Sequence, residues 1–176
     1  MKIVQKFGDY SEGSLSYENV DRYAEIKVKS DNLTEMNTPS RGIVYLALTE
    51  KTKRYRDKLT GQYKFDNPDS KNFFKYFAVK GYSQYAKVDD NMDRTLTSRT
   101  EERKYYLKND SAGGEIEFKS NLNDNHQLTY GVDYSEADIS RLRTTISSTT
   151  GTSTAKDTPD TNIKRTGIYL QDEFSL

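Results

Sequence analysis

The sequence predicts an all-β, antiparallel fold of long strands, of the kind that forms part of a transmembrane β-barrel. Apolar and polar residues alternate with a period of two along several stretches. Hydrophobic residues make up only 33% of the 176 residues, yet 12% are aromatic, with 14 tyrosines. Short polar turns alternate with long polar stretches. A barrel fits all three observations, because only every second residue of its strands faces lipid and its aromatic residues gather at both membrane interfaces.

Composition excludes several functions. The 27 Lys and Arg residues balance 27 Asp and Glu residues, which argues against a general nucleic-acid binder. With no cysteine and one histidine, the chain has no disulfide, no thiolate nucleophile and no cysteine or histidine cluster for a metal. Disorder is the first alternative at a mean hydropathy of −0.96, but the aromatic content opposes it. No apolar run is long enough for a membrane-spanning helix, and residues 1–9 lack the apolar core of a signal peptide.

The first half of the chain contains strand-like segments separated by polar stretches. Alternation predicts strands at Leu15–Glu18 and Tyr23–Lys29, and the polar stretch Asp31–Ser40 predicts a loop. Gly42–Leu48 is the most apolar run and fits either a strand or the start of a helix. Thr49–Lys58 has helix-compatible residues, so both assignments stay open there.

The middle of the chain begins with a turn at Asp66–Ser70, where proline, aspartate and asparagine favour a turn. Phe73–Val88 then has high β-propensity, and the acidic stretch Asp89–Asp93 is expected to end that strand. We expect Glu101–Lys104 to be a solvated loop. The pair Gly113–Gly114 lacks the context of a phosphate-binding loop, which favours a bulge or the start of a strand.

A hairpin is the clearest local prediction. Gly114–Leu122 and Leu128–Tyr134 both alternate, and the short polar turn Asn123–His126 joins them. In a barrel, charged side chains must avoid lipid. The lipid-facing set is then Ile116, Phe118, Leu128, Tyr130 and Val132, and the interior set is Glu115, Glu117, Thr129 and Asp133.

The last third predicts a long mobile loop and a final strand. Thr144–Thr161 contains 11 Ser or Thr in 18 residues, a composition that buries no core. Thr166–Leu176 alternates as a strand. The connections Asp89–Thr100 and Ser140–Arg165 are expected to be long, in contrast to the tight turn Asn123–His126. This asymmetry is typical of outer-membrane barrels.

Two blocks of sequence carry a family resemblance. The block Asn123–Tyr134 and the later block Thr166–Phe174, with its Tyr169–Glu173 motif, resemble consecutive barrel strands of TonB-dependent outer-membrane receptors. The run Phe77–Asp93, with Tyr82–Tyr85 at its centre, resembles the branch that takes haem or iron from haemoglobin, transferrin or lactoferrin.

The resemblance implies that residues 1–176 are a partial barrel domain, a fragment of a 22-stranded barrel without a plug domain or a signal peptide. The full-length parent is then expected in the cell outer membrane, in contact with the lipid bilayer, a host haem- or iron-carrier protein and TonB. Haem or iron is the transported ligand and not a resident cofactor. The resemblance places Thr144–Thr161 and Asp89–Asp93 on the extracellular side.

No catalytic constellation emerges, so the chain is not expected to be an enzyme, and no metal ligand is assigned. His126 is expected to be a plain turn residue, and the tyrosines are expected in the membrane-interface girdles. Cofactor-binding residues stay unassigned. The alternatives are a self-contained eight-stranded outer-membrane barrel and a soluble β-rich binding module, which bind no nucleic acid either.

Overall fold

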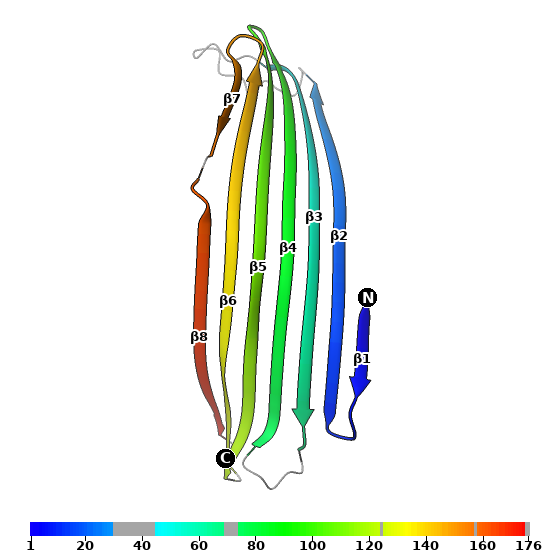
Figure 1. Ribbon diagram of the computed structural model, residues 1–176, viewed down its shortest axis with the longest axis vertical. Helices are drawn as coiled ribbons and strands as arrows, with labels where there is room; N and C mark the ends of the chain where they lie inside the picture. The colour runs from blue at the N-terminus through cyan, green and yellow to red at the C-terminus, as the bar shows by residue number, and fades with distance from the viewer. Residues whose placement is uncertain (30–44, 69–73, 124, 157, 175–176) are drawn as a thin grey trace.

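A computed structural model of the chain describes residues 1–29, 45–68, 74–123, 125–156 and 158–174. The strands in these residues lie side by side in one antiparallel sheet (Figure 1). Their bounds are β1 Lys2–Lys6, β2 Ser11–Lys29, β3 Tyr45–Asp66, β4 Phe74–Leu96, β5 Thr100–Asn123, β6 His126–Ser147, β7 Gly151–Ala155 and β8 Thr161–Phe174. The described residues contain no helix that is long and apolar enough to cross a membrane. The all-β, antiparallel prediction is confirmed.

The sheet is a meander in which the strands from β1 to β7 follow one another in chain order. The edge formed by β6 takes two partners. The segment Arg143–Ser147 pairs with β7, and His126–Ile139 pairs with β8. Strands β7 and β8 therefore occupy successive lengths of one edge, and β1 forms the opposite edge. In the described residues no pairing joins the two edges, so the sheet is open.

The predicted hairpin is present as β5 and β6. Ile116 pairs with Val132 and Phe118 pairs with Tyr130, as the alternation requires. The Oδ1 atom of Asn123 accepts hydrogen bonds from the backbone N–H groups of Asn125 and His126, at 2.9 and 3.0 Å. This asparagine closes the turn by satisfying backbone donors that the ladder leaves free. His126 begins β6 and does not lie within the turn.

The undecided segment Thr49–Lys58 is part of strand β3 and pairs on both sides, with β2 and with β4. Its helix-compatible residues are Glu50 and the lysines and arginines, and their backbone forms ladders with both neighbouring strands. Tertiary pairing here overrides the weak local preference. The two predicted strands Leu15–Glu18 and Tyr23–Lys29 are likewise one strand, β2.

The prediction that Asp89–Asp93 ends a strand is wrong, because β4 continues to Leu96. Strand β5 begins at Thr100, so Glu101–Lys104 is also strand and not a solvated loop, and the connection Thr97–Arg99 is short. Several of these charges pair with a residue two positions along the same face of their strand, and Glu101 pairs with Arg94 on the neighbouring strand. Lys87 pairs with Asp89 at 2.8 Å, for example. The charged residues at these ends of β4 and β5 therefore made strand segments resemble loops in the sequence.

The predicted mobile loop Thr144–Thr161 is also wrong. Residues 144–147 end β6, a turn covers 148–150, and β7 pairs back onto β6. Gly151 has φ of +77°, which suits the turn. Threonine is β-branched and favours strands, so a Ser/Thr-rich composition does not prevent pairing. The expected strand Thr166–Leu176 is present as β8, which begins earlier, at Thr161.

The remaining sequence predictions concern the glycine pair and two connections. Gly113 and Gly114 lie in the middle of β5, where the pairing shows no register shift, so they are neither a bulge nor a strand start. The turn at Asp66–Ser70 is described only as far as Pro68. The expected loop Asp31–Ser40 lies outside the described residues.

Candidate functional site

The two faces of the sheet differ in chemistry. The register of the strand pairs shows which residues share a face. We call face A the face that carries Tyr63, Val79, Ile116, Val132 and Ile168, which pair in one row across five strands. Face B carries the alternate residues, among them Gln62, Lys80, Glu115 and Asp133. The lipid-facing and interior sets of the predicted hairpin are therefore separated onto opposite faces, as expected.

Face A carries a band without charged side chains. On β4 the band runs from Phe77 to Tyr85, and on β5 it runs from Ala112 to Ser120. Eight residue steps cover about 27 Å along a strand at about 3.4 Å per residue. At the tilt usual for barrels this corresponds to a height of about 21 Å, close to the apolar band of about 25 Å in membrane barrels.

Many apolar side chains of face A are exposed. Ile168 is 85% exposed, Leu170 is 72% exposed and Val132 is 40% exposed. Only three hydrophobic residues of the described chain are buried, namely Leu48, Ala78 and Leu96. The sheet is a single layer in these residues, so no second sheet or helix covers face A. An apolar surface that crosses most strands of a sheet needs a partner.

Aromatic residues border the band at both ends. Near the β5–β6 turn, Phe65, Phe77, Phe118 and Tyr130 form one row across four strands. The ring centroids of Phe77 and Phe118 lie 5.2 Å apart, and those of Phe118 and Tyr130 lie 5.4 Å apart. At the other end, face A carries Tyr17, Tyr55, Tyr85, Tyr106 and Tyr134.

The tyrosines at the end of the band away from the β5–β6 turn mark the change from apolar to charged residues on face A. Tyr17 donates a hydrogen bond of 2.6 Å to Asp57, and Asn19 donates one of 2.8 Å to the same oxygen. The ammonium group of Lys87 lies 5.1 Å from the ring centroid of Tyr106. Aromatic rings with apolar bodies and polar tips suit such a boundary.

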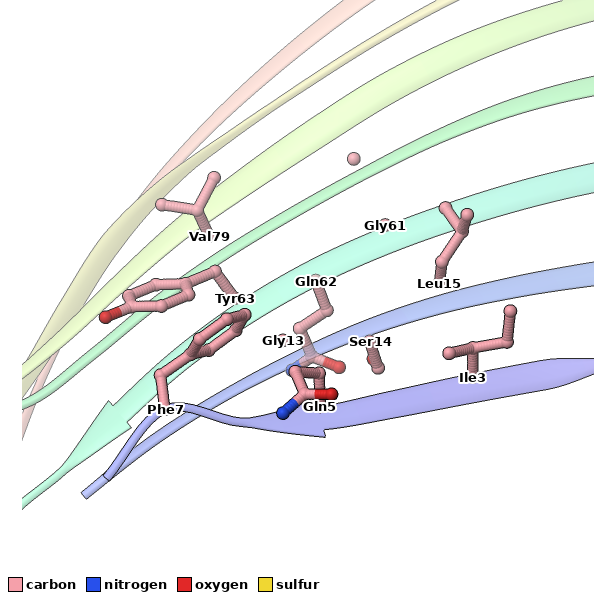
Figure 2. A pocket seen from close by; sticks show the side chains of 11 residues that line it. Ile3, Gln5, Phe7, Gly13, Ser14, Leu15, Gly61, Gln62, Tyr63 and Val79 are labelled. Atoms are coloured by element: carbon pink, nitrogen blue, oxygen red, sulfur yellow. The ribbon is translucent and has the colours of Figure 1, made fainter. Parts of the chain in front are cut away.

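The hollow at the β1 edge of face A is shallow and mainly apolar (Figure 2). It encloses about 490 Å³ and its lining includes Ile3, Phe7, Leu15 and Tyr63. The Phe7 ring lies over Gly13, where an added Cβ would be 3.0 Å from it. The hollow therefore extends the apolar band to the edge of the sheet.

Face B is polar opposite the band. The Tyr169 hydroxyl lies 3.3 Å from a Glu115 carboxylate oxygen and 3.2 Å from one of Glu117, and donates to them. Its ring lies over Gly131, where an added Cβ would be 2.5 Å from the hydroxyl oxygen. Glycine suits this position because the Ile116 backbone carbonyl, at 2.4 Å from an added Cβ, and the tyrosine together occupy the space of a side chain. The Tyr169–Glu173 motif is thus joined to the β5–β6 hairpin through face B.

Face B also carries arginines, and all of those in the described strands except Arg165 lie beyond the band. Every arginine that lies in a described strand is on this face: Arg22, Arg54, Arg56, Arg94, Arg103, Arg141, Arg143 and Arg165. Sequence reasoning missed this set. The spacing of Arg54 with Arg56, and of Arg141 with Arg143, was the available signal, since residues two apart share a face of a strand.

The β4–β5 tip, well outside the band, holds a buried ion-pair cluster. Glu101 pairs with Arg94, and both side chains are almost fully buried. Arg103 adds a contact at 3.4 Å, and Arg99 donates to the other carboxylate oxygen. Burial alone raises the pKa of Glu101, but the hydrogen bond from Arg99 and the three positive charges outweigh it, so that pKa lies below its ordinary value.

His126 lies at the opposite end of the sheet, with Nδ1 2.8 Å from Asp172 and its ring 4.7 Å from that of Phe174. These contacts tie the start of β6 to β8. No group of three or more His, Cys, Asp or Glu side chains in the described residues is arranged to hold a metal ion. The chain matches no protein-family model and no curated protein.

Proposed function

We propose that this chain is a wall segment of an outer-membrane β-barrel, and that its parent is a TonB-dependent receptor for haem or iron taken from a host carrier protein. Face A would contact lipid, and face B would line the interior. The observation that carries the proposal is the uncovered, charge-free band on face A, which is backed by charged residues on face B.

Strand length supports a receptor whose wall rises beyond the membrane. Strands β4 and β5 have 23 and 24 residues, whereas about 9–11 residues suffice to cross a bilayer. The band occupies the half of the sheet that contains the β5–β6 turn. The charged half then stands outside the bilayer, where a large protein ligand is accessible.

The receptor assignment itself rests on the resemblance of two sequence blocks. These blocks lie on β6 and β8, which pair in register over their common length, Tyr130 with Leu170 and Gly131 with Tyr169. Neighbouring strands are the arrangement that the resemblance implies. The open edges of the described sheet favour a piece of a larger barrel over a self-contained small one, and the uncovered face A disfavours a soluble module.

Lipid contact is testable by fluorescence quenching. This segment has no cysteine, so single-cysteine variants can be labelled specifically in a cysteine-free parent. We expect a fluorophore at Ile116→Cys or Val132→Cys in proteoliposomes to be quenched strongly by nitroxide lipids. Matched labels at Ser111→Cys and Ser135→Cys on face B should be quenched weakly. Equal quenching on the two faces would refute the orientation.

Receptor function needs a separate experiment. Replacing residues 148–160 of the full-length parent by a short flexible linker removes β7 and its two connections. Carrier binding and haem-dependent growth should then be measured independently. Unchanged carrier binding would show that the hairpin of β6 and β7 is not part of the ligand-binding surface. Growth on haem in cells that lack the parent protein would end the receptor proposal.

A further inference from the structure

One cross-strand row of face B, beyond the band, combines positive charge with apolar side chains. It crosses the five neighbouring strands from β2 to β6 (Figure 1) and contains, in that order, Arg22, Arg54, Val88, Leu107 and Arg141. We call it the arginine row. Arg22 and Arg54 stand directly opposite each other, an arrangement that is unfavourable by itself because like charges directly opposite destabilise a sheet.

The described residues do not neutralise the charge of the arginine row. None of its three guanidinium groups has a hydrogen bond or an ion pair with another described residue. The two nearest acidic residues of face B are engaged elsewhere. Glu18 pairs with Arg56, and Asp90 accepts a hydrogen bond of 3.3 Å from Thr52.

The excess of positive charge is specific to this part of face B. In the described strands, the arginine row and the two rows beside it hold five arginines against one acidic residue, Asp90. Face A differs at the same height, because several of its lysines pair with carboxylates on their own strands, as Lys108 does with Asp110 at 2.6 Å. A partner that complements the arginine row therefore carries negative charge.

We propose that the arginine row binds an extended acidic segment of the carrier protein, in which one apolar side chain lies between two acidic ones. The first acidic residue lies on Arg22 and Arg54. The apolar residue lies on Val88 and Leu107, and the second acidic residue lies on Arg141. The inference rests on the proposed function and adds the chemistry by which the carrier is recognised.

The linear spacing of the arginine row fits an extended chain that lies across the strands. Neighbouring strands are about 4.8 Å apart, so Arg54 and Arg141, three strands apart, are separated by about 14 Å. In an extended segment, residues four positions apart point to the same side and are also about 14 Å apart. The residue midway between them is about 7 Å from Arg54, which places it between Val88 and Leu107. The matching pattern is acid–x–apolar–x–acid.

The composition of the arginine row favours a polypeptide as its partner. A single small anion reaches only the opposed pair Arg22 and Arg54 and leaves Arg141 without a partner. A sugar chain offers no apolar side chain for Val88 and Leu107. Arginine suits carboxylates because its planar fork binds both oxygens and it stays charged.

The arginine row is accessible from outside the cell in the proposed orientation. Leu107 lies eight residue steps beyond Glu115, which is near the middle of the band on β5. This is about 27 Å along the strand and about 21 Å from the bilayer midplane at a usual barrel tilt. The hydrocarbon core ends about 15 Å from the midplane, so a segment that enters the barrel mouth reaches the row without crossing lipid.

The test uses the full-length receptor in detergent and two fluorescent synthetic peptides. The matched peptide has aspartate at its first and fifth positions, leucine at its third and serine between them. The scrambled peptide has the same residues with the two aspartates adjacent, so that they point to opposite sides of an extended chain. The double variant Arg22→Gln/Arg54→Gln removes two charges of the row. Lys53→Gln is the matched control, because Lys53 is adjacent to Arg54 but lies on face A.

A heat-modifiable gel shift first establishes that each variant is a folded barrel. We then expect the double variant to lose at least about tenfold in affinity for the matched peptide, since a hydrogen bond between charged groups contributes enough for that change. The scrambled peptide should bind the unmodified receptor at least about tenfold more weakly than the matched one. The matched peptide should compete with the carrier, and Lys53→Gln should change neither peptide nor carrier binding.

Equal affinity for the two peptides, or unchanged binding of the matched peptide by the double variant, would overturn the proposal. A matched peptide that binds at the row without displacing the carrier would also overturn it, because the segment would then belong to another protein. If the unmodified receptor binds no peptide while the double variant unfolds at lower denaturant concentration, a segment of the parent chain occupies the row, and the carrier is not its partner.

Two outcomes separate a failure of this inference from a failure of the proposed function. If the receptor shows no heat-modifiable form and its face A labels are not quenched by lipid, the proposed function itself fails. If a folded, lipid-quenched receptor binds the carrier equally well with and without the charges of Arg22 and Arg54, only the present inference is refuted.

Discussion

A lysine placed at Ile116 tests the lipid-facing role of face A most directly. Ile116 is the middle residue of the charge-free stretch from Ala112 to Ser120 on β5. Four residue steps separate it from either end, which is about 14 Å along the strand and about 10 Å in depth at a usual barrel tilt. Ile116→Lys should therefore place its ammonium group near the bilayer midplane.

The expected cost of Ile116→Lys is about 2–4 kcal/mol, the penalty for a cation at the midplane on the lipid face of a barrel. Ala112→Lys lies at the end of the same stretch and should cost only about 0–1 kcal/mol, because the penalty falls toward the interface. Ser111→Lys is adjacent but on face B, between Gln84 and Ala137, and should be nearly neutral.

Denaturant titration of the full-length barrel in phospholipid vesicles gives the free energy of unfolding for each variant. We expect the free energy of unfolding of Ile116→Lys to lie far below those of Ala112→Lys and Ser111→Lys. This expectation would be refuted if Ile116→Lys were neutral, or if Ser111→Lys destabilised the barrel equally. The first result would show that Ile116 does not face lipid. The second would show that lysine destabilises the barrel on either face.

Three other predictions concern packing and the tip. Gly131→Ala should destabilise the barrel by about 1–3 kcal/mol through overpacking against the Ile116 backbone carbonyl and the Tyr169 side chain. Gly61→Ala, whose nearest atom is a leucine methyl at 3.9 Å, should be nearly neutral in the same titration. Glu101→Gln leaves the Arg94 charge buried and should open the β4–β5 tip by about 3–5 kcal/mol in hydrogen exchange, while Glu102→Gln on the exposed face should not. The pKa of Glu101 lies below its ordinary value, so ionised Glu101 stabilises the β4–β5 tip fully at any pH above that ordinary value. This stabilisation is lost as the pH falls through the lowered pKa. Exchange at the tip should therefore accelerate only below about pH 4, and acceleration between pH 5 and 7 would contradict this assignment.

The sequence by itself determined the local features of the sheet. Alternation within Gly114–Leu122 and Leu128–Tyr134, with a short polar turn between them, predicted the hairpin and the separation of Ile116 and Val132 from Glu115 and Asp133. These features need only the period of two and turn chemistry, which act between residues close in the chain.

Only the tertiary structure decided where strands continue and which side chains meet. Asp89–Asp93 and Thr144–Thr161 carry no strong apolar pattern, and neighbouring strands supply the ladders that keep much of their backbone extended. The row that contains Arg22, Arg54 and Arg141 joins residues up to 119 positions apart. Its existence depends on the register of four successive pairings, and a slip of one residue in any of them would place an arginine on the opposite face.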